Sequence, residues 1–453
     1  MTQTIGIGCG AGFSGDRTDA PIAVVNALAA RTEPAFLILE TLGERTLADA
    51  QMARRRDPSA GFEPLLAEML RPVLADCLRH KIRIVSNCGA ANPKGAAHLI
   101  EDLADELGIA KPKVAVVLGD DLTADLPTLP RSPWEGEPEG STIPLDKVVA
   151  ANAYLGCQGI VDALDGGADI VVTGRVADPG LALGPLRHVF GWAADDWDKL
   201  ASGILAGHLL ECGAQVTGGY FADPGLKDVP EPDNIGYPIA EISADGSIII
   251  TKPNGTGGLV SERTVKEQIL YEIHDPAAYI TPDAVLDLTE VAVKRISENR
   301  VAVTGARGKP ATDSYKVTVS LVGGWLGEGE ISYAGPNAEA RARLCADTLR
   351  RRLSRRELAV RSRIDLIGVS SIFDDDGGSL AADSIGRAED VRVRLAVDAP
   401  DQATVEHATQ EVLAMLCAGP AGGGGARRRH VERIKTISCL VPKSAVSHAV
   451  EWR

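Results

Sequence analysis

Short runs of apolar, often β-branched residues alternate with longer amphipathic stretches through the first two hundred residues of this chain. The runs have the length of strands, and the stretches between them repeat apolar residues at helical spacing. Such alternation is typical of βαβ units, in which helices connect parallel strands. It predicts an α/β domain over residues 1–235, built on a mostly parallel sheet with helices on both faces. The runs lie at residues 5–8, 36–40, 82–87, 114–119 and 169–174.

After this first domain the pattern changes. Two apolar runs, at residues 239–242 and 248–250, flank an Asp-Gly turn, which indicates a β-hairpin. Further strand patterns then alternate with two long helical patterns, at residues 337–356 and 402–417. This order predicts a second, smaller α+β domain over residues 236–453, for which a ferredoxin-like arrangement is one candidate.

The composition excludes several classes of protein. Apolar residues make up 45% of the chain, enough to bury a core, which disordered chains cannot do. Acidic residues outnumber basic ones by 62 to 47 and aromatic residues are 4%, unlike a nucleic-acid-binding protein. No apolar run reaches the roughly 18–20 residues of a membrane span, and no export signal opens the chain. We therefore expect a cytoplasmic protein that binds neither nucleic acid nor membranes, and whose eight cysteines are free thiols.

Polar and glycine-rich loops follow four of the predicted strands, at residues 9–17, 87–93, 119–121 and 173–179. Because the carboxyl ends of parallel strands meet at one edge of a sheet, where ligands bind, we expect these loops to form one site. The substrate-binding candidates in them are Ser14, Arg17, Asn87, Asn92, Arg175 and Asp178.

The first of these loops contains the G-x-G-x-x-G pattern of dinucleotide-binding proteins. Glu40 ends the second predicted strand, where an acid would bind the ribose in that fold. Asp19 and Pro21, however, mark a helix start several residues after the last glycine. In the dinucleotide fold the glycine run leads directly into the helix, so we expect no nicotinamide or other cofactor here. The glycines are Gly10, Gly12 and Gly15.

Arg17 and Arg175 each follow a predicted strand and carry the planar group of donors that binds carboxylates and phosphates. Each also has an acid nearby, Asp16 or Asp178, and could instead form an internal ion pair that fixes its turn. The sequence leaves both interpretations open. The first glycine-rich loop is therefore either a substrate-binding loop or a tight turn.

One predicted helical segment carries His208, Glu211 and Cys212 on the same face, because residues three and four apart are neighbours on a helix. A histidine beside a glutamate can serve as an acid–base pair, and the glutamate raises the pKa of the imidazole. The same pair could supply two metal ligands, but no third ligand is visible and we expect no metal. A structural role for His208 in the core is the third alternative. Gln215 and Thr217 continue this segment as substrate-binding candidates.

A glycine-rich stretch at residues 419–425 runs into Arg427, Arg428 and Arg429. Backbone amides in such a stretch can bind an anion, and the arginines add a cationic spot to an acidic protein. The stretch therefore fits either the phosphate groups of a CoA ester or a plain loop.

At these motifs the chain resembles the acyclic terpene utilisation family (AtuA-like proteins), and the resemblance covers nearly the whole chain. Members are encoded with enzymes that degrade citronellol and geraniol through branched acyl-CoA esters, so the resemblance implies a role in such catabolism. Many members carry a small additional C-terminal domain, which is not found here before Arg453. We expect that piece as a separate subunit, or a homo-oligomer. The matching motifs lie at residues 10–17, 87–93, 173–178, 207–219 and 419–427.

Our main hypothesis is an enzyme that acts on a small, branched carboxylic acid or its CoA thioester by hydration, dehydration or another lyase-type step. Such a step requires an acid, a base and donors to an oxyanion, but no redox cofactor. The residues assigned to these roles are Asp16, His208 and Glu211 for proton transfer, Arg17 and Arg175 for a carboxylate or phosphate, and Asn87 and Asn92 for a carbonyl oxygen.

Two alternatives stay open beside this hypothesis. The first is a hydrolase with Ser14 or Cys9 as nucleophile, although Ser14 lacks the G-x-S-x-G context of a nucleophile elbow. The second is a non-catalytic subunit that delivers an acyl-CoA ester to a partner enzyme. Turnover by the purified chain alone distinguishes the enzyme from the subunit.

Overall fold

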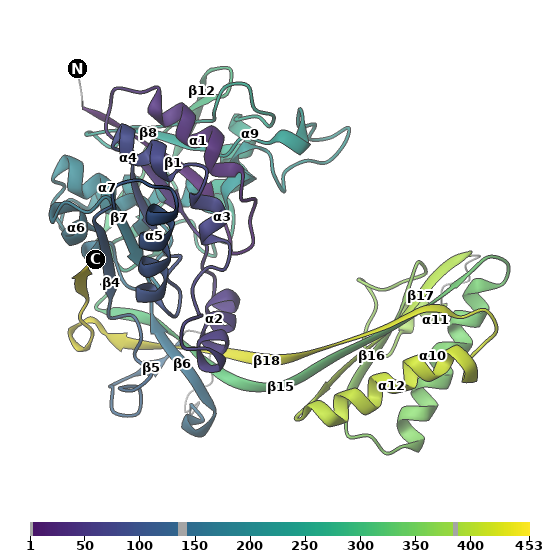
Figure 1. The fold of residues 1–453 in the computed structure, drawn as a ribbon. Coiled ribbons are helices and arrows are strands. Elements are labelled where there is room, and N and C mark those ends of the chain that lie inside the picture. Colours follow the sequence, from purple (N-terminus) through teal and green to yellow (C-terminus); the bar gives the residue numbers. More distant parts are fainter. Residues whose placement is uncertain (1–2, 135–142, 384–387) are drawn as a thin grey trace. The chain divides into compact units, whose positions relative to one another are not determined.

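A computed structural model describes residues 3–134, 143–383 and 388–453 of the chain (Figure 1). Contacts divide the chain into two compact units, one of Met1–Ser320 with Thr436–Arg453 and the other of Leu321–Lys435. This division differs from the predicted one into residues 1–235 and 236–453. The reason is that strands following residue 236 hydrogen-bond into the same sheet as the first strand of the chain.

The centre of the main sheet in the first unit is parallel, and each of the predicted apolar runs forms one of its strands. Their side chains are buried on both faces, which explains why the runs are continuously apolar rather than alternating. In order across the sheet, the strands are β1 (Thr4–Ala11), β2 (Ala35–Leu39), β3 (Arg83–Ser86), β7 (Ile170–Thr173) and β4 (Val114–Leu118).

Antiparallel strands extend this sheet on both sides, so the sheet is mixed and not mostly parallel as predicted. The predicted hairpin forms, but its first strand pairs with β1 instead of beginning a second domain. A hairpin pattern is local and does not specify which sheet the hairpin joins. The added strands are β8 (Ile239–Ser243), β9 (Ile248–Thr251), β13 (Arg300–Thr304) and β12 (Ala292–Ser297) beyond β1, and β19 (Ala449–Trp452) beside β4.

Alternate residues of the central strands enter two separate hydrophobic cores. Phe36 and Ile38 of β2 belong to the core that contains residues of α6 (Gln158–Asp165), α7 (Gly180–Phe190) and α8 (Trp197–Leu210). Leu37 and Leu39 belong to the core that contains residues of α1 (Ala20–Ala29), α3 (Leu66–Leu70), α4 (Leu74–His80) and α5 (Pro93–Glu106). Because successive side chains of a strand point to opposite faces of the sheet, each central strand contributes residues to both cores.

The described residues of the first unit include two further helices, a further strand and a small sheet. α2 (Glu44–Arg56) follows β2, and β6 (Val148–Ala153) precedes α6. α9 (Glu262–Leu270) begins with a capping box, in which the Ser261 hydroxyl accepts a hydrogen bond from the Thr264 amide. A small sheet consists of β10 (Tyr279–Ile280), β11 (Val285–Asp287) and β14 (Arg307–Lys309).

The second unit contains a β-α-β-β-α-β succession, which is the order of the ferredoxin-like motif. Its strands lie in the order β16-β17-β15-β18, and residues of both long helices share a core with β17. The elements are β15 (Ser314–Ala334) from Leu321 on, α10 (Ala338–Arg355), β16 (Arg361–Ile367), β17 (Asp390–Ala399), α12 (Gln402–Ala418) and β18 (Gly424–Pro442) up to Lys435, with the short α11 (Ser379–Asp383) before β17.

The predicted cationic spot lies where β18 begins. The Arg427 guanidinium donates to Glu330 at 2.7 Å, and that of Arg428 donates to Gln410 at 2.8 Å. These two arginines therefore have partners within their own unit.

No helix in the described residues is both long and apolar enough to cross a membrane. All eight cysteines are free, as predicted. Most of them are buried, where a thiol packs as a small apolar side chain.

Candidate functional site

The loops that follow β2, β3 and β7 are tied together by hydrogen bonds. After β3, the Asn87 Oδ1 accepts the backbone amide of Thr41 at 2.7 Å, and its Nδ2 donates to Glu40 at 3.4 Å. After β7, the Arg175 guanidinium donates to the carbonyl oxygen of Leu42. Residues 40–42 are therefore the point at which these three loops meet, at the sheet edge where ligands bind in parallel folds.

Arg175 and Asp178 form the internal ion pair that the sequence left open, with a distance of 3.1 Å between Nη2 and Oδ2. The Arg175 side chain is 2% exposed, and its guanidinium lies over the Tyr154 ring at 4.0 Å. Burial acts to lower the pKa of Arg175, but the charge of Asp178 holds that pKa above its ordinary value. Within the described residues, the buried Arg175 Nε and Asp178 Oδ1 have no hydrogen-bond partner.

Buried acids around this ion pair have pKa values near neutrality. Burial raises the pKa of Glu40 to about 8, and the charge of Asp178 adds to the rise against the Leu42 amide and Arg175. Burial also raises the pKa of Asp178 to about 6, although Arg175 opposes it. Asp120 follows β4 and accepts the Arg175 amide at 2.9 Å, and burial raises its pKa to about 6. We call Glu40, Asp120, Arg175 and Asp178 the charged cluster.

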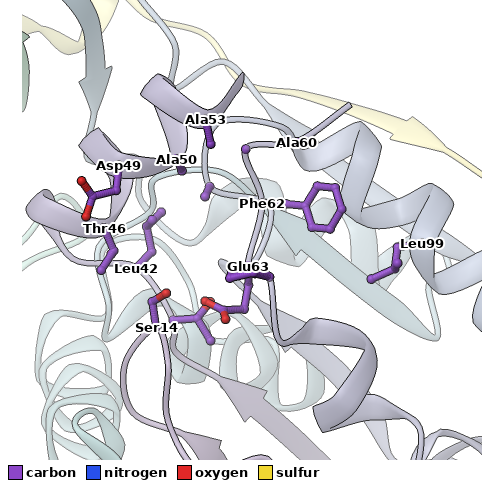
Figure 2. Close-up of a pocket in the computed structure, with 14 residues that line it drawn as sticks. Ser14, Leu42, Thr46, Asp49, Ala50, Ala53, Ala60, Phe62, Glu63 and Leu99 are labelled. Atoms are coloured by element: carbon purple, nitrogen blue, oxygen red, sulfur yellow. The ribbon is translucent and has the colours of Figure 1, made fainter. Parts of the chain in front are cut away.

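A cavity of about 480 Å³ lies beside the charged cluster. Thr41 and Leu42 line it, so the segment held by Asn87 and Arg175 is also part of the cavity wall. Most of the lining is apolar, which suits a small aliphatic ligand. The residues that line the cavity are Ser14, Thr41, Leu42, Thr46, Asp49, Ala50, Ala53, Ala60, Gly61, Phe62, Glu63, Pro64, Ala90 and Leu99 (Figure 2).

Glu63 is the most deeply buried acid of this lining, with 3% of its surface exposed. Its Oε1 accepts the Leu65 amide at 3.0 Å, whereas its buried Oε2 has no partner within the described part of the chain. Figure 2 shows its carboxyl group turned to the same end of the cavity as the Ser14 side chain. The sequence does not mark this residue as a candidate, because it lies in a loop that matches no motif.

Asp16 closes the first glycine-rich loop. Its carboxylate accepts the amides of Gly12 and Arg17, each at 2.8 Å, and the Tyr237 hydroxyl at 2.5 Å. Both carboxylate oxygens are therefore occupied by the protein. The ion pair considered between Asp16 and Arg17 is instead formed by Arg17 and Asp19, at 2.9 Å. Of the candidates in this loop, Ser14 alone is among the described residues that line the cavity.

His208 and Glu211 form a buried pair, with 2.5 Å between Nδ1 and Oε1. The other ring nitrogen, Nε2, lies 3.2 Å from the carbonyl oxygen of Ile269, so both nitrogens have partners. Burial acts to lower the pKa of His208, but the neighbouring Glu211 carboxylate raises it above the ordinary value. The two side chains, three residues apart, are thus neighbours, and the charge of Glu211 also raises the pKa of Asp178.

The helix that carries His208 does not continue as predicted. α8 ends at Leu210, and Cys212 adopts a left-handed conformation (φ 58°) before a short 3-10 helix at Gly213–Thr217. The start of this 3-10 helix packs closely against the first glycine-rich loop. Position 12 of that loop must be glycine, because a Cβ there would lie 2.2 Å from the Gly213 nitrogen. Gln215 and Thr217 lie in this 3-10 helix, and the Thr217 hydroxyl donates to its own segment at Ala214.

Asn92 has a positioning role at the start of α5. Its Oδ1 accepts the Gly95 amide at 3.0 Å, which caps the helix, and its Nδ2 donates to the Ala60 carbonyl at 2.9 Å. Asn92 therefore fixes the loop that supplies Ala60 and Phe62 to the cavity wall. Within the described ranges, no group of three or more His, Cys, Asp and Glu side chains is placed to hold a metal ion.

Comparison with known proteins connects this geometry to one family. The protein-family model described as acyclic terpene utilisation family protein AtuA matches residues 5–452, nearly the whole chain. No curated protein matches the chain.

Proposed function

Because the chain belongs to the acyclic terpene utilisation family, we propose that its cavity binds a small, branched, acyclic acid or the corresponding CoA thioester. The apolar cavity at the carboxyl edge of the parallel strands is the observation that carries this proposal. Its volume of about 480 Å³ falls within the range of small-molecule sites, roughly 300–1,000 Å³. Leu42, Phe62 and Leu99 supply apolar surface for a branched hydrocarbon chain.

The reaction that we propose is the addition or removal of water, or another lyase-type step. It needs hydrogen-bond donors for a carbonyl oxygen and a group that transfers a proton. Ser14 lies on the cavity wall, and its hydroxyl group can serve as a donor. Asp16 and His208 act in this proposal as positioning residues, since the protein itself occupies both oxygens of Asp16 and both ring nitrogens of His208.

The surroundings of the two candidate nucleophiles favour a lyase-type step over hydrolysis. Cys9 is fully buried, its thiol donates to the Ala11 carbonyl at 3.1 Å, and burial raises its pKa well above the ordinary value. A thiol in that state is a poor nucleophile. The Ser14 hydroxyl has no hydrogen-bond partner in the described part of the chain, so no base is bonded to it.

Ligand binding by the purified chain tests the proposal. We expect 3,7-dimethyloctanoic acid or its CoA thioester to raise the melting temperature more than the straight-chain isomers, decanoic acid and decanoyl-CoA. The isomers have the same number of carbon atoms, so the comparison isolates branching. Equal shifts for both pairs, or no shift for any of them, would contradict the proposal. Turnover of a bound ligand by the chain alone would separate an enzyme from a carrier subunit.

A further inference from the structure

We infer that Glu63 is the proton-transfer residue of the cavity and that the acyl group it acts on carries a hydroxyl. This inference rests on the proposed function and assigns both the substrate class and the acid–base group. Three observations carry it: Glu63 has a fixed backbone, its buried Oε2 has no partner among the described residues, and the described residues of the cavity wall include no cation.

The backbone around Glu63 is fixed at both ends of the residue. The Glu63 amide donates to the carbonyl oxygen of Cys88 at 2.8 Å, which anchors this loop to the end of β3. The Glu63 carbonyl accepts the Leu66 amide at 3.2 Å, at the start of α3. With Oε1 bound to the Leu65 amide, the carboxyl group has a defined direction, as a catalytic group requires.

The second oxygen, Oε2, is the atom that meets a ligand. It is buried, and no described residue hydrogen-bonds to it. A buried acceptor without a donor is destabilising, and more so when it is charged. Such a group in a native protein needs an explanation, and a ligand that donates a hydrogen bond to Oε2 supplies one here. Figure 2 shows the carboxyl group among the cavity-lining side chains, at the end near Ser14.

The chemistry of the wall decides which donor fits. The described residues that line the cavity include no Lys, Arg or His, whereas they include two acids, Glu63 and Asp49. A free carboxylate would therefore meet two acids and no compensating cation. A hydroxyl group on an apolar chain satisfies Oε2 without adding charge. The thioester of a hydroxylated, branched acyl group fits these requirements better than the free acid.

The reaction balances with Glu63 alone as acid and base. The Glu63 carboxylate takes a proton from the carbon next to the thioester carbonyl, and the electrons of that C–H bond form the carbon–carbon double bond. The C–O bond of the hydroxyl breaks, and the Glu63 proton passes to the departing oxygen. One hydroxyacyl thioester thus gives one enoyl thioester and one water, and the carboxylate is restored. Hydration is the reverse sequence.

The test compares the wild-type chain with Glu63→Gln, Glu63→Leu and Glu68→Gln, the last being an exposed acid of α3 that serves as the matched control. The ligands are 3-hydroxy-3,7-dimethyloctanoyl-CoA and its deoxy analogue, 3,7-dimethyloctanoyl-CoA. Calorimetry measures binding, and ultraviolet absorbance of the conjugated product measures dehydration. Thermal unfolding shows whether each variant is folded, and Glu63→Gln keeps the acceptor for the Leu65 amide.

We expect the wild type and Glu68→Gln to bind the hydroxylated thioester about tenfold or more tightly than the deoxy analogue. Glu63→Leu should lose that preference. Glu63→Gln should lower kcat by about 10²–10⁴-fold with KM changed far less, because it preserves shape but cannot transfer a proton. Wild-type turnover by folded Glu63→Gln would overturn the catalytic assignment.

The same experiment separates two kinds of failure. If neither thioester binds the wild-type chain, the proposed function itself fails. If both thioesters bind the wild type equally, the cavity site stands and the assignment of Glu63 to a hydroxyl group is wrong.

Discussion

The guanidinium of Arg175, which follows β7, donates a hydrogen bond to the carbonyl oxygen of Leu42, which follows β2. Leu42 in turn lines the apolar cavity. One buried cation therefore joins the charged cluster to the wall of the proposed binding site. The cluster consists of structural and titrating groups, and the cavity beside it offers space for a ligand at this edge.

Replacing Arg175 with Met tests this connection. The substitution leaves Asp178 buried beside Glu40 without its cation, and we expect it to lower the free energy of unfolding by about 3–5 kcal/mol. Chemical denaturation measures the change. Arg71→Met is the control, because the Arg71–Glu106 pair is exposed and its loss should cost less than about 1 kcal/mol. Equal effects of the two substitutions would show that Arg175 does not hold the loops together.

The sequence predicts the parallel centre of the sheet because each of its strands is a local pattern. The runs that become β1, β2, β3, β4 and β7 are apolar, of strand length and followed by turn residues. The antiparallel strands were missed as part of this sheet because their pairing is not local. β19, at the end of the chain, pairs with β4 more than three hundred residues earlier, and no periodicity records such a contact.

Only those site residues that come directly after a predicted strand, or that share a helical spacing, could be predicted from the sequence. Asn87 and Arg175 follow strands, and His208 and Glu211 are three residues apart, so a pattern marked each of them. Glu63 belongs to a loop whose position depends on a hydrogen bond to Cys88, a contact that the sequence does not reveal. The hydrogen bonds that occupy Asp16 and His208 are likewise tertiary, and they change the role assigned to both residues.

The stability of the protein should depend on pH through Glu40. Its pKa is about 8 in the folded chain and about 4.3 in an unfolded one, so folding favours the protonated acid. The resulting stabilisation is complete below about pH 4 and is lost as the pH rises to about 8. Glu40→Gln mimics the neutral acid at every pH. We expect its stability relative to the wild type to increase across this interval, on the order of a few kcal/mol.

Denaturation curves at several pH values measure the Glu40 effect. The control is Glu68→Gln, since Glu68 is exposed and its removal should leave the pH dependence of the wild type unchanged. A constant difference between Glu40→Gln and the wild type from pH 4 to 9 would contradict the burial of a neutral acid at this position.

Substituting Gly12 with Ala should disturb the first loop. The new Cβ would lie 2.2 Å from the backbone nitrogen of Gly213, and backbone atoms cannot move aside as a flexible side chain does. We expect a loss of about 1–3 kcal/mol in unfolding free energy, as for other overpacked positions. Gly424→Ala is the control, because a methyl group at that position would have no atom within 4 Å. A Gly12→Ala variant as stable as the wild type would rule out this close contact between the loops.

The substitution His208→Ala tests whether this histidine has a structural or a catalytic role. The substitution leaves the buried Glu211 without its partner, so we expect about 3–5 kcal/mol of destabilisation. Because the pKa of His208 is raised on folding, its ion pair stabilises the wild type most below the unfolded pKa of about 6.5 and less as the pH rises through the folded value. Turnover per folded molecule should stay within about tenfold of the wild type. A loss of more than a hundredfold in folded protein would return His208 to the reaction itself.

Calorimetric titration of 3,7-dimethyloctanoyl-CoA into the wild-type chain and into Ala53→Phe tests the cavity assignment most directly. Ala53 lines the cavity, and a phenyl ring there takes up space that the branched chain requires. An exposed alanine of α12, in Ala403→Phe, receives the same ring away from the cavity and serves as the control. We predict tight binding to the wild type and to Ala403→Phe, and at least a tenfold weaker affinity for Ala53→Phe. Equal affinities in all three proteins would show that the ligand binds elsewhere.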